Sequence, residues 1–160
     1  MAAHQDAVYR LACSMLGSTD QADDVTQDAF VALYQSPIAF ESDDHRRNWL
    51  LKVAANQCRN IIRDRKRHPS LNLDEAHRAV DRANHRAFER AEHDRDQSMV
   101  LWEHVDRLPL DLREVVHLRY GEDLDTKSIA AICGISVGAA HVRLFRARTR
   151  LRESLEGGDR

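Results

Sequence analysis

The stretch of sequence that decides the fold is TKSIAAICGISVGAAHVRLFRARTRLR, residues 126–152. Asp125 or Thr126 can cap a short first helix, and Gly134 stands where a tight turn requires a positive φ. Ser136 then offers a cap for a second, longer helix. This order of cap, short helix, glycine turn, cap and longer helix predicts a helix-turn-helix.

The second helix of this motif has one apolar face and one basic face. Its apolar side chains recur at helical spacing, at Val137, Ala140, Leu144, Ala147 and Leu151. The other face carries His141, Arg143, Phe145, Arg146, Arg148, Arg150 and Arg152. A helix fits the DNA major groove, where arginine pairs with guanine edges or phosphates, so this face predicts binding to duplex DNA. The alternative is a solvated helical hairpin whose arginines merely suit the negative end of the helix dipole.

The composition of the whole chain indicates an all-helical globular protein. Of its 160 residues 42% are hydrophobic, glycine (6) and proline (3) are scarce, and no sustained alternating β-pattern occurs, so we expect an all-α fold. No apolar run approaches the roughly 18 residues of a membrane span, and the N-terminus lacks a signal-peptide pattern. The widely spaced Cys13, Cys58 and Cys133 indicate small core residues of a cytoplasmic protein.

Charge is sorted along the chain, although the formal net charge is only −2. Residues 37–68 contain eight basic and four acidic side chains, and residues 129–152 contain five arginines and no acid. The neighbouring segments, 6–36 and 69–128, are acidic on balance. Two positive segments within acidic surroundings indicate two anion-binding surfaces rather than a uniformly solvated exterior.

Two helices are expected before residue 36. The first carries apolar side chains at helical spacing over residues 8–16 and ends at Gly17. The second is capped within residues 18–20 and runs to about Gln35. Its inner stripe consists of Ala22, Val25, Ala29 and Leu33. Its outer side carries Asp23, Asp24, Gln27 and Asp28.

A long third helix carries the first basic segment. We expect Asp43 and Asp44 to cap it and Lys66 to lie near its end. One continuous stripe along it holds Lys52, Asn56, Arg59, Arg63 and Lys66, beginning beside Trp49. A basic groove with a neighbouring aromatic side chain is typical of proteins that bind single strands and splay out bases. The alternative is an ordinary solvated face with Trp49 as a core side chain.

Residues 68–97 are mostly charged and polar, and we interpret them as a linker that is at most partly helical. Metal-binding side chain types recur in it every four residues, at His77, Asp81, His85, Glu89 and His93. An exposed single helix lacks the closed coordination shell and the supporting partners of a metal site. We therefore predict no metal site and no cofactor.

Two groups of motifs, in this order, resemble the bacterial extracytoplasmic-function (ECF) RNA polymerase sigma factors. The segments DDVTQDAF (residues 23–30) and NWLLKVAAN (residues 48–56) are similar to domain two of that family. Similarity to its domain four is carried by LP (108–109), REV (113–115), LRY (118–120), IA (129–130), GISVG (134–138) and RLFRAR (143–148). The resemblance implies sigma domain two at residues 1–67, a linker at 68–97 and sigma domain four at 98–156.

The resemblance also implies a role for each surface. Contacts to core RNA polymerase would come from Asp23, Asp24, Val25, Gln27, Asp28 and Phe30; the alternative for these acids is a plain solvated face. The opened −10 promoter element would be held by Phe40, Ser42, His45, Arg46, Arg47, Trp49, Lys52, Asn56, Arg59 and Arg63. The −35 element would be read in duplex form by Ser136, Ala139, His141, Arg143, Phe145, Arg146 and Arg148. An anti-sigma factor is a further implied partner, and no membrane insertion is expected.

Two places depart from the family pattern. His45 and Arg46 stand where a small residue and an aromatic one usually precede the tryptophan. Residues 139–142 read AAHV, where a Thr-Val-Lys/Arg-Ser run is common. The residue that wedges the duplex open and the preferred −35 sequence therefore do not follow from the resemblance.

Two other classes of function are alternatives to a promoter-specificity subunit. A helix-turn-helix regulator that acts without core polymerase needs neither the basic stripe beside Trp49 nor an acidic docking helix. An enzyme, for example a hydrolase using the His/Asp/Glu column of the linker, would need a nucleophile–base pair or a phosphate loop, and we find neither. We therefore expect a non-enzymatic sigma factor that directs promoter recognition, DNA melting and transcription initiation.

Overall fold

The computed structural model describes residues 2–68 and 96–157, and all structural statements below concern these two segments. Every regular element in them is helical, which confirms the expected all-α fold. Residues 69–95 lie outside the described residues, and they include most of the predicted linker (68–97) and its column from His77 to His93. The last two residues of that predicted linker, 96 and 97, begin a helix.

The first two helices end where the sequence predicts, and the first begins at Ala2, before the apolar pattern of residues 8–16. Helix α1 spans Ala2–Leu16 and is followed by Gly17, whose φ of 65° only glycine adopts at little cost. Helix α2 spans Thr19–Gln35, and the Ser18 hydroxyl accepts a hydrogen bond from the backbone N–H of Gln21. The two helices therefore form an antiparallel pair joined by a two-residue connection.

The third helix has a different cap from the one predicted. Helix α3 spans Asp43–Arg67, and the hydroxyl of Ser42 accepts a hydrogen bond of 3.0 Å from the backbone N–H of His45. Asp43 and Asp44 are the first two helical residues, so the expectation that they cap the helix is wrong. Their carboxylates instead lie in the first turn, where negative charge is favoured by the helix dipole.

The second half of the chain begins with two short helices and a π-helical turn. Helix α5 spans Asp96–Asp106, α6 spans Leu110–Val116, and η2 spans His117–Gly121 and directly continues α6. Residues from α5, from the α5–α6 connection, from α6 and from α8 form a small apolar cluster. Its members are Val105, Leu108, Leu112, Val116 and Ala147.

The helix-turn-helix is confirmed. Helix α7 spans Thr126–Cys133 and α8 spans Val137–Gly157, and the two meet at an angle of 101°. The Asp125 carboxylate caps α7, the Ser136 hydroxyl caps α8, and Gly134 between them has a φ of 68°. The direction of the long helix α8 is therefore set by a turn whose caps and glycine were predicted from the sequence.

The apolar stripe of α8 is shorter than predicted. Ala140, Leu144 and Ala147 are buried and Leu151 is half-buried, as expected. Val137, in the first turn of the helix, is 44% exposed, so the stripe begins at Ala140.

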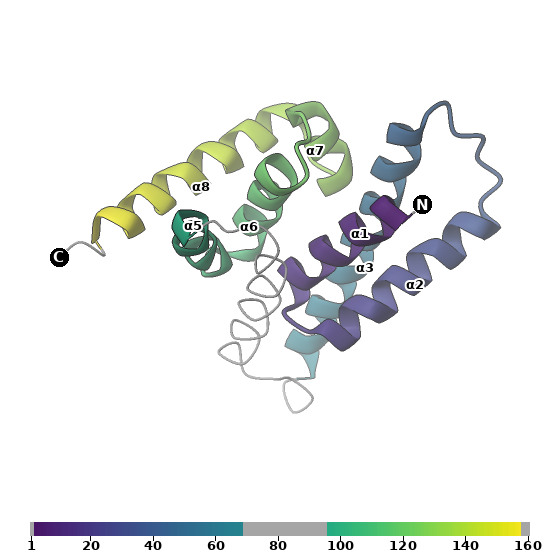
Figure 1. Cartoon of the computed structure of the whole chain (residues 1–160), viewed down its shortest axis with the longest axis horizontal. Helices are drawn as coiled ribbons and strands as arrows, with labels where there is room; N and C mark the ends of the chain where they lie inside the picture. Colours follow the sequence, from purple (N-terminus) through teal and green to yellow (C-terminus); the bar gives the residue numbers. More distant parts are fainter. Residues whose placement is uncertain (1, 69–95, 158–160) are drawn as a thin grey trace.

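The two halves of the chain pack directly against each other. Figure 1 shows α1, α2 and α3 together on one side, with α6 and α7 between this bundle and α8. Helix α7 contacts α3, and α6 contacts α1. One continuous buried cluster includes Leu11, Leu16, Leu50 and Leu51 from the first half and Val115, Leu118, Ile129 and Ile132 from the second. The charged composition of the linker allowed both a compact and an extended arrangement, and the structure is compact.

No single helix within residues 2–68 and 96–157 has both the length and the apolarity needed to cross a membrane. Helices α7 and α8 reach that combination only as a pair, across the bend between them.

Candidate nucleic-acid and polymerase interfaces

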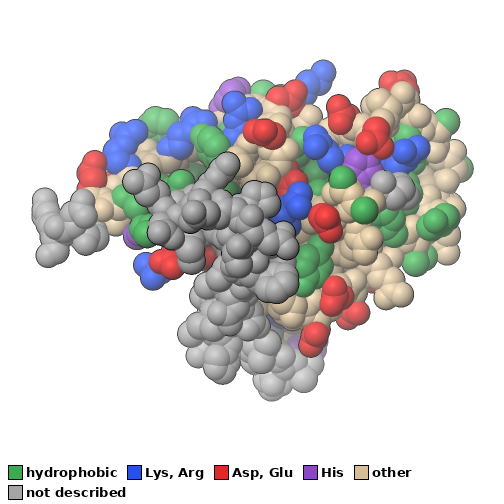
Figure 2. Space-filling model, viewed as in Figure 1, with side chains coloured by type: hydrophobic (Ala, Val, Ile, Leu, Met, Phe, Trp, Pro, Cys, Tyr) green, Lys and Arg blue, Asp and Glu red, His purple; other side chains and the backbone are tan. Residues whose placement is uncertain are grey.

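Helix α8 presents most of its basic side chains to solvent. Exposed side chains are those of Ser136, His141, Phe145, Arg146, Arg148, Arg150 and Arg152, whereas Ala139 and Arg143 are half-buried. Phe145 is 68% exposed among the arginines, as the sequence analysis expected. Figure 2 shows Lys and Arg side chains along the edge of the molecule that α8 forms. Such a face provides both cations for phosphates and an apolar group for a thymine methyl.

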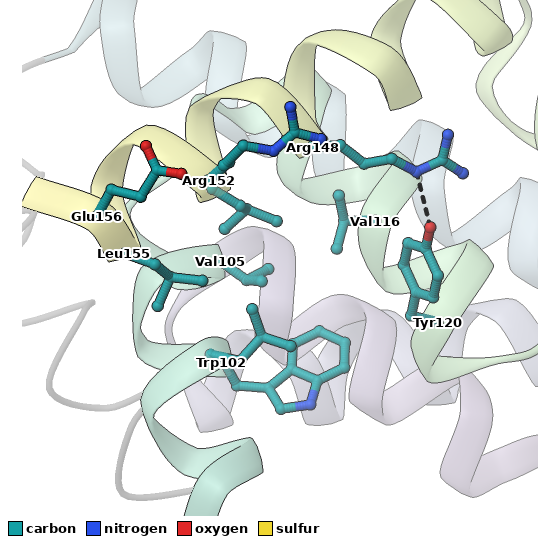
Figure 3. Close-up of a pocket in the computed structure, with 10 residues that line it drawn as sticks. Trp102, Val105, Val116, Tyr120, Arg148, Arg152, Leu155 and Glu156 are labelled. Carbon is teal, nitrogen blue, oxygen red and sulfur yellow. Dashed lines mark hydrogen bonds between the residues drawn. The ribbon is translucent and has the colours of Figure 1, made fainter.

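Arg148 is held in place by Tyr120, the last residue of the LRY motif, which had no predicted contact of its own. The Arg148 Nε donates a hydrogen bond of 2.8 Å to the Tyr120 hydroxyl, and its guanidinium carbon lies 5.9 Å from the centre of the tyrosine ring (Figure 3). Arg146 lies two residues earlier and thus on a different side of the helix. The predicted single basic face is therefore divided, with Arg148 on the flank of α8 that faces η2.

An apolar groove of about 470 Å³ runs beside this flank, between α5, the α6–η2 segment and α8 (Figure 3). Its lining consists of Leu101, Trp102, Val105, Val116, Tyr120, Arg148, Leu151, Arg152, Leu155 and Glu156. Leu101 and Leu155 remain exposed at the surface. The second half of the chain thus has an apolar surface in addition to its basic one.

The basic stripe of α3 is only partly open to solvent. Lys52, Asn56, Arg63 and Lys66 are exposed, as a binding stripe requires. Arg59, in the middle of the stripe, is half-buried against the second half of the chain. Helix α3 therefore has an open flank and a flank that α7 covers.

Arg59 is engaged by groups from α6 and α7. Its Nη1 lies 2.6 Å from the carboxylate of Glu114, and its Nη2 donates to the backbone carbonyl of Ile132 at 3.3 Å and also to Asn56. Burial raises the pKa of Glu114, although the positive charge of Arg59 and hydrogen bonds from Cys133 and Arg59 act in the opposite direction. The pair is thus a partly desolvated contact between the two halves.

A second ion-pair group joins α1 to the segment after η2. Arg10 donates two hydrogen bonds of 2.9 Å to the carboxylate of Glu122, and the imidazole Nε2 of His117 lies 3.3 Å from the same group. Burial opposes ionisation of Glu122, but hydrogen bonds from His117 and Arg10 outweigh it and lower the pKa of this carboxyl. Asn48 and Ser128 form a further contact between the halves at 3.4 Å.

An aromatic cluster orders the loop that precedes α3. The Phe40 ring packs edge-on against His45 and Trp49, at centroid distances of 5.2 and 5.7 Å, and Arg46 lies 5.5 Å from its centre. The Nδ1 atom of His45 accepts a hydrogen bond from the backbone N–H of Glu41. Trp49 is half-buried against the core, so the alternative interpretation of it as a core side chain is met in part. The structure therefore brings together four of the residues predicted to contact the −10 element.

The outer side of α2 is acidic and exposed. Asp23, Asp24, Gln27 and Asp28 all point to solvent, and Gln57 of α3 donates a hydrogen bond of 2.7 Å to Asp28. Val25 is fully buried, so its selection as a polymerase contact is corrected: it is a core residue of the bundle. Phe30 is half-buried and lines a shallow groove between α1 and α2.

This acidic face continues into apolar side chains that the sequence analysis missed. Val31 is 47% exposed and Tyr34 is 85% exposed, on the half of α2 that follows Asp28. Tyr34 follows Phe30 by four residues and Gln27 by seven, so helical spacing alone was sufficient to place it on this surface.

No group of three or more His, Cys, Asp or Glu side chains that could hold a metal ion occurs in the described part of the chain. The histidine column considered in the linker lies outside it.

Comparison with known proteins assigns both halves. Residues 1–68 match the family Sigma-70 region 2, and residues 98–151 match the family Sigma-70, region 4. The ECF RNA polymerase sigma-E factor of Escherichia coli K12 is 30% identical over 131 residues, which cover 78% of this chain and 69% of that protein. The chain belongs to the ECF RNA polymerase sigma factors.

Two other relatives are also named ECF RNA polymerase sigma factors. SigW of Bacillus subtilis is 29% identical, over 95% of this chain and 84% of the relative. SigE of Mycolicibacterium smegmatis is 30% identical over 95% of this chain but only 58% of the relative. The sigma factor therefore spans 84% of one of these relatives and little more than half of the other.

Two solved structures share the arrangement of helices. The sigma factor RpoE of Bartonella quintana, solved in complex with the anti-sigma factor NepR, aligns with a TM-score of 0.72 at 22% identity over 97% of this chain and 93% of RpoE. CnrH, solved in complex with the cytosolic domain of CnrY, aligns with a TM-score of 0.66 at 26% identity, over 98% of this chain and 84% of CnrH. Family and fold together favour the sigma factor over an independent helix-turn-helix regulator.

Proposed function

We propose that this ECF sigma factor binds core RNA polymerase through α2, holds the opened −10 element on α3 and its preceding loop, and reads the −35 element with α8. The observation that carries the proposal is the presence of two separate basic surfaces and one acidic surface on a single chain of this family. The chain does no covalent chemistry in this scheme and acts in the cytoplasm, where the polymerase is.

The polymerase contact is assigned to the exposed acids Asp23, Asp24 and Asp28 together with Gln27 and Phe30. Charge complementarity with a basic partner surface speeds and orients association. Val31 and Tyr34 extend this surface with apolar area, which supplies the desolvated centre that a specific interface needs.

The −10 contact is assigned to the residues around the Phe40 cluster and to the open flank of α3. Phe40, His45 and Trp49 offer aromatic surfaces for unstacked bases, and Lys52 and Arg63 offer cations for the strand that carries them. Ser42, Arg46, Arg47, Asn56 and Arg59 complete this proposed surface.

The −35 contact is assigned to the first three turns of α8. Phe145 and Arg146 are exposed, and His141, which is also exposed, lies one turn earlier. Because Ala139 cannot hydrogen-bond to a base edge through its side chain, these residues would carry the sequence preference.

Transcription in vitro tests the scheme. The full chain is added to sigma-free core polymerase with a library of DNA fragments from the source genome, and transcript 5′ ends are mapped. We expect discrete start sites that share two upstream elements at a fixed spacing. Transcription no greater than that of core alone, with core binding no stronger than that of serum albumin, would refute the proposal.

A charge-matched pair of variants isolates the polymerase contact. Asp24→Asn removes an exposed acid from α2, whereas Asp64→Asn removes an exposed acid from the far end of α3. We expect only the first to weaken binding to core polymerase, measured by fluorescence anisotropy at physiological salt. Equal losses would indicate a general charge effect instead of a docking surface.

We also propose that an anti-sigma factor binds this chain. Support comes from the similar RpoE fold, which was solved with the anti-sigma factor NepR bound. Affinity purification of the tagged full chain from its source cells, followed by mass spectrometry, should recover one stoichiometric non-polymerase partner. Recovery of polymerase subunits alone would contradict this part of the proposal.

A further inference from the structure

The outermost side of α8 is apolar, although the helix is rich in arginine. On the side away from the buried Ala140 and Leu144, four residues follow one another at helical spacing, and we call them the outer stripe: Gly138, Val142, Phe145 and Thr149. Val142 is 46% exposed and Phe145 is 68% exposed. Gly138 has no side chain, and the Thr149 hydroxyl donates a hydrogen bond of 3.0 Å to the backbone carbonyl of Phe145. The outer stripe therefore presents hydrocarbon to its surroundings rather than hydrogen-bonding groups.

Arginines flank the outer stripe on both sides. Arg148 and Arg152 lie on one flank, where they line the apolar groove beside η2 (Figure 3). The other flank carries the exposed Arg146 and Arg150 and the half-buried Arg143, again at helical spacing. Residues 134–152 contain no Asp or Glu, so no acidic side chain within these turns offsets the positive charge.

This arrangement matches the major groove of duplex DNA. The groove is about 12 Å wide and a helix with its side chains is about 10–12 Å across, so the outer stripe faces the base edges when the flanks face the two phosphate backbones. Both walls of the groove are lined by phosphates, which are the partners that two rows of arginine require. The charge on both flanks therefore favours duplex DNA, and not an apolar protein surface, as the occupant of this side of α8.

Thymine is the base that an apolar stripe can recognise. Every base pair presents hydrogen-bond donors or acceptors in the major groove, and thymine alone adds a methyl group there. Val142 and Phe145 can pair with none of the donors or acceptors, but contact with a methyl group removes the apolar surface of both partners from water. The C5-methyl group is therefore the feature of a base edge that these two side chains contact favourably.

We propose that Val142 and Phe145 are specificity-determining residues, which select −35 elements with thymines on neighbouring base pairs by contacting their C5-methyl groups. This inference rests on the proposed function, because it assumes that α8 lies on the −35 duplex. Three residues advance a helix by about 4.5 Å, which is comparable with the roughly 3.4 Å between successive base pairs. For a helix that lies along the groove, the two side chains therefore meet neighbouring base pairs, while Arg148, Arg150 and Arg152 contact phosphates.

Removing single methyl groups from the DNA tests this contact without changing the protein. A promoter mapped with the holoenzyme is synthesised with deoxyuridine in place of each thymine of its −35 element in turn, since deoxyuridine keeps the base pair and lacks only the methyl group. Binding of the holoenzyme is measured at low temperature, in the closed complex. We expect binding about fourfold weaker at each of two neighbouring thymines, and no change for deoxyuridine between the two elements. Equal affinities for all of these duplexes would overturn the inference.

Val142→Ala and Phe145→Ala assign each methyl group to its side chain. Both side chains are exposed, so the substitutions remove no core contact. We expect each variant to bind the unsubstituted promoter several-fold more weakly, and to lose little more when deoxyuridine replaces its own partner thymine. Val100→Ala is the matched control, because Val100 of α5 is 50% exposed and lies outside the outer stripe. It should leave the discrimination against deoxyuridine unchanged. Additive losses at every thymine for both α8 variants would overturn the inference.

Replacing the whole −35 element with an unrelated sequence distinguishes failure of this inference from failure of the proposed function. If the replacement leaves binding of the holoenzyme unchanged, or if no promoter can be mapped, the proposed −35 role of α8 fails and the inference fails with it. If the replacement weakens binding but no deoxyuridine does, other groups select the element and only the inference fails. If Val142→Ala weakens transcription equally on promoters with and without a −35 element, the outer stripe contacts protein, and the inference again fails alone.

Discussion

Replacing Arg10 with methionine is expected to weaken the joint between the two halves of the chain. Methionine retains the apolar stem but removes the two 2.9 Å hydrogen bonds to Glu122. Removing one partner of a buried ion pair costs about 3–5 kcal/mol. Arg10 is 34% exposed, so solvent already screens this pair, and His117 remains beside Glu122. We therefore expect a loss of about 2 kcal/mol in the free energy of unfolding.

The two tryptophans allow each half to be followed separately during urea unfolding. Trp49 lies in α3 and Trp102 in α5, so Trp49→Phe and Trp102→Phe each leave one reporter. In the parent protein we expect the two reporters to share one transition because a continuous core joins the halves. In the Arg10→Met background the two midpoints should separate or both move to lower urea.

A double-mutant cycle with Glu122→Gln provides the decisive control. If the ion pair carries the effect, Arg10→Met should cost much less once the carboxylate is gone. Arg67→Met, an exposed arginine in the last turn of α3, is the matched control and should cost little. A loss below about 0.5 kcal/mol for Arg10→Met, or full additivity in the cycle, would refute the reasoning.

Three further outcomes follow from features described above. Gly134→Ala should lower the unfolding free energy by about 1–2 kcal/mol because the φ of Gly134 is 68°. Gly138→Ala, within α8, should be neutral or stabilising because an added Cβ would make only an ordinary contact of 4.0 Å with the Ser136 hydroxyl. Calorimetric melting checks both variants. The pKa of Glu122 is lowered, so its stabilisation is complete above its ordinary pKa of 4.5 and is lost as the pH falls through the lowered value. Urea titrations below pH 4.5 should therefore show a smaller acid loss for Glu122→Gln than for the parent, and parallel curves would contradict this. Arg146→Ala should reduce the salt slope of duplex binding by about 1, and an unchanged slope would exclude it from the contact surface.

Features that depend on a few neighbouring residues were predictable from the sequence. Gly17, Ser18, Gly134 and Ser136 each act within one helical turn, and the structure has each of them in the predicted role. The exposure of Phe145 followed from helical spacing in the same way.

Local rules were wrong where several neighbouring residues could cap the same helix. Ser42, Asp43 and Asp44 are all good caps, and only the backbone geometry assigns the cap to Ser42. Val25 was wrong for a different reason. It lies in a motif that resembles the family's polymerase-binding segment, but its side chain is fully buried in the core.

Contacts between the halves could not be predicted from the sequence. Charge counts along the chain revealed two basic segments, but the acids that meet Arg10 and Arg59 lie 112 and 55 residues away. The approach of α6 and α7 to the first bundle is set by the packing of Val115, Leu118 and Ile129 against it. Periodicity shows that these side chains are buried, but it does not show which surface covers them.

The buried cysteines make the opening of the molecule chemically observable. Cys13, Cys58 and Cys133 form no disulfide. Burial, and to a smaller extent the negative charge of Glu114, raises the pKa of the Cys58 thiol to about 12 and also raises the pKa of the Cys133 thiol. Only the thiolate reacts with alkylating agents, so both thiols are protected while the halves stay packed. Their rate of alkylation under native conditions would therefore measure how often α7 leaves α3, without any added label.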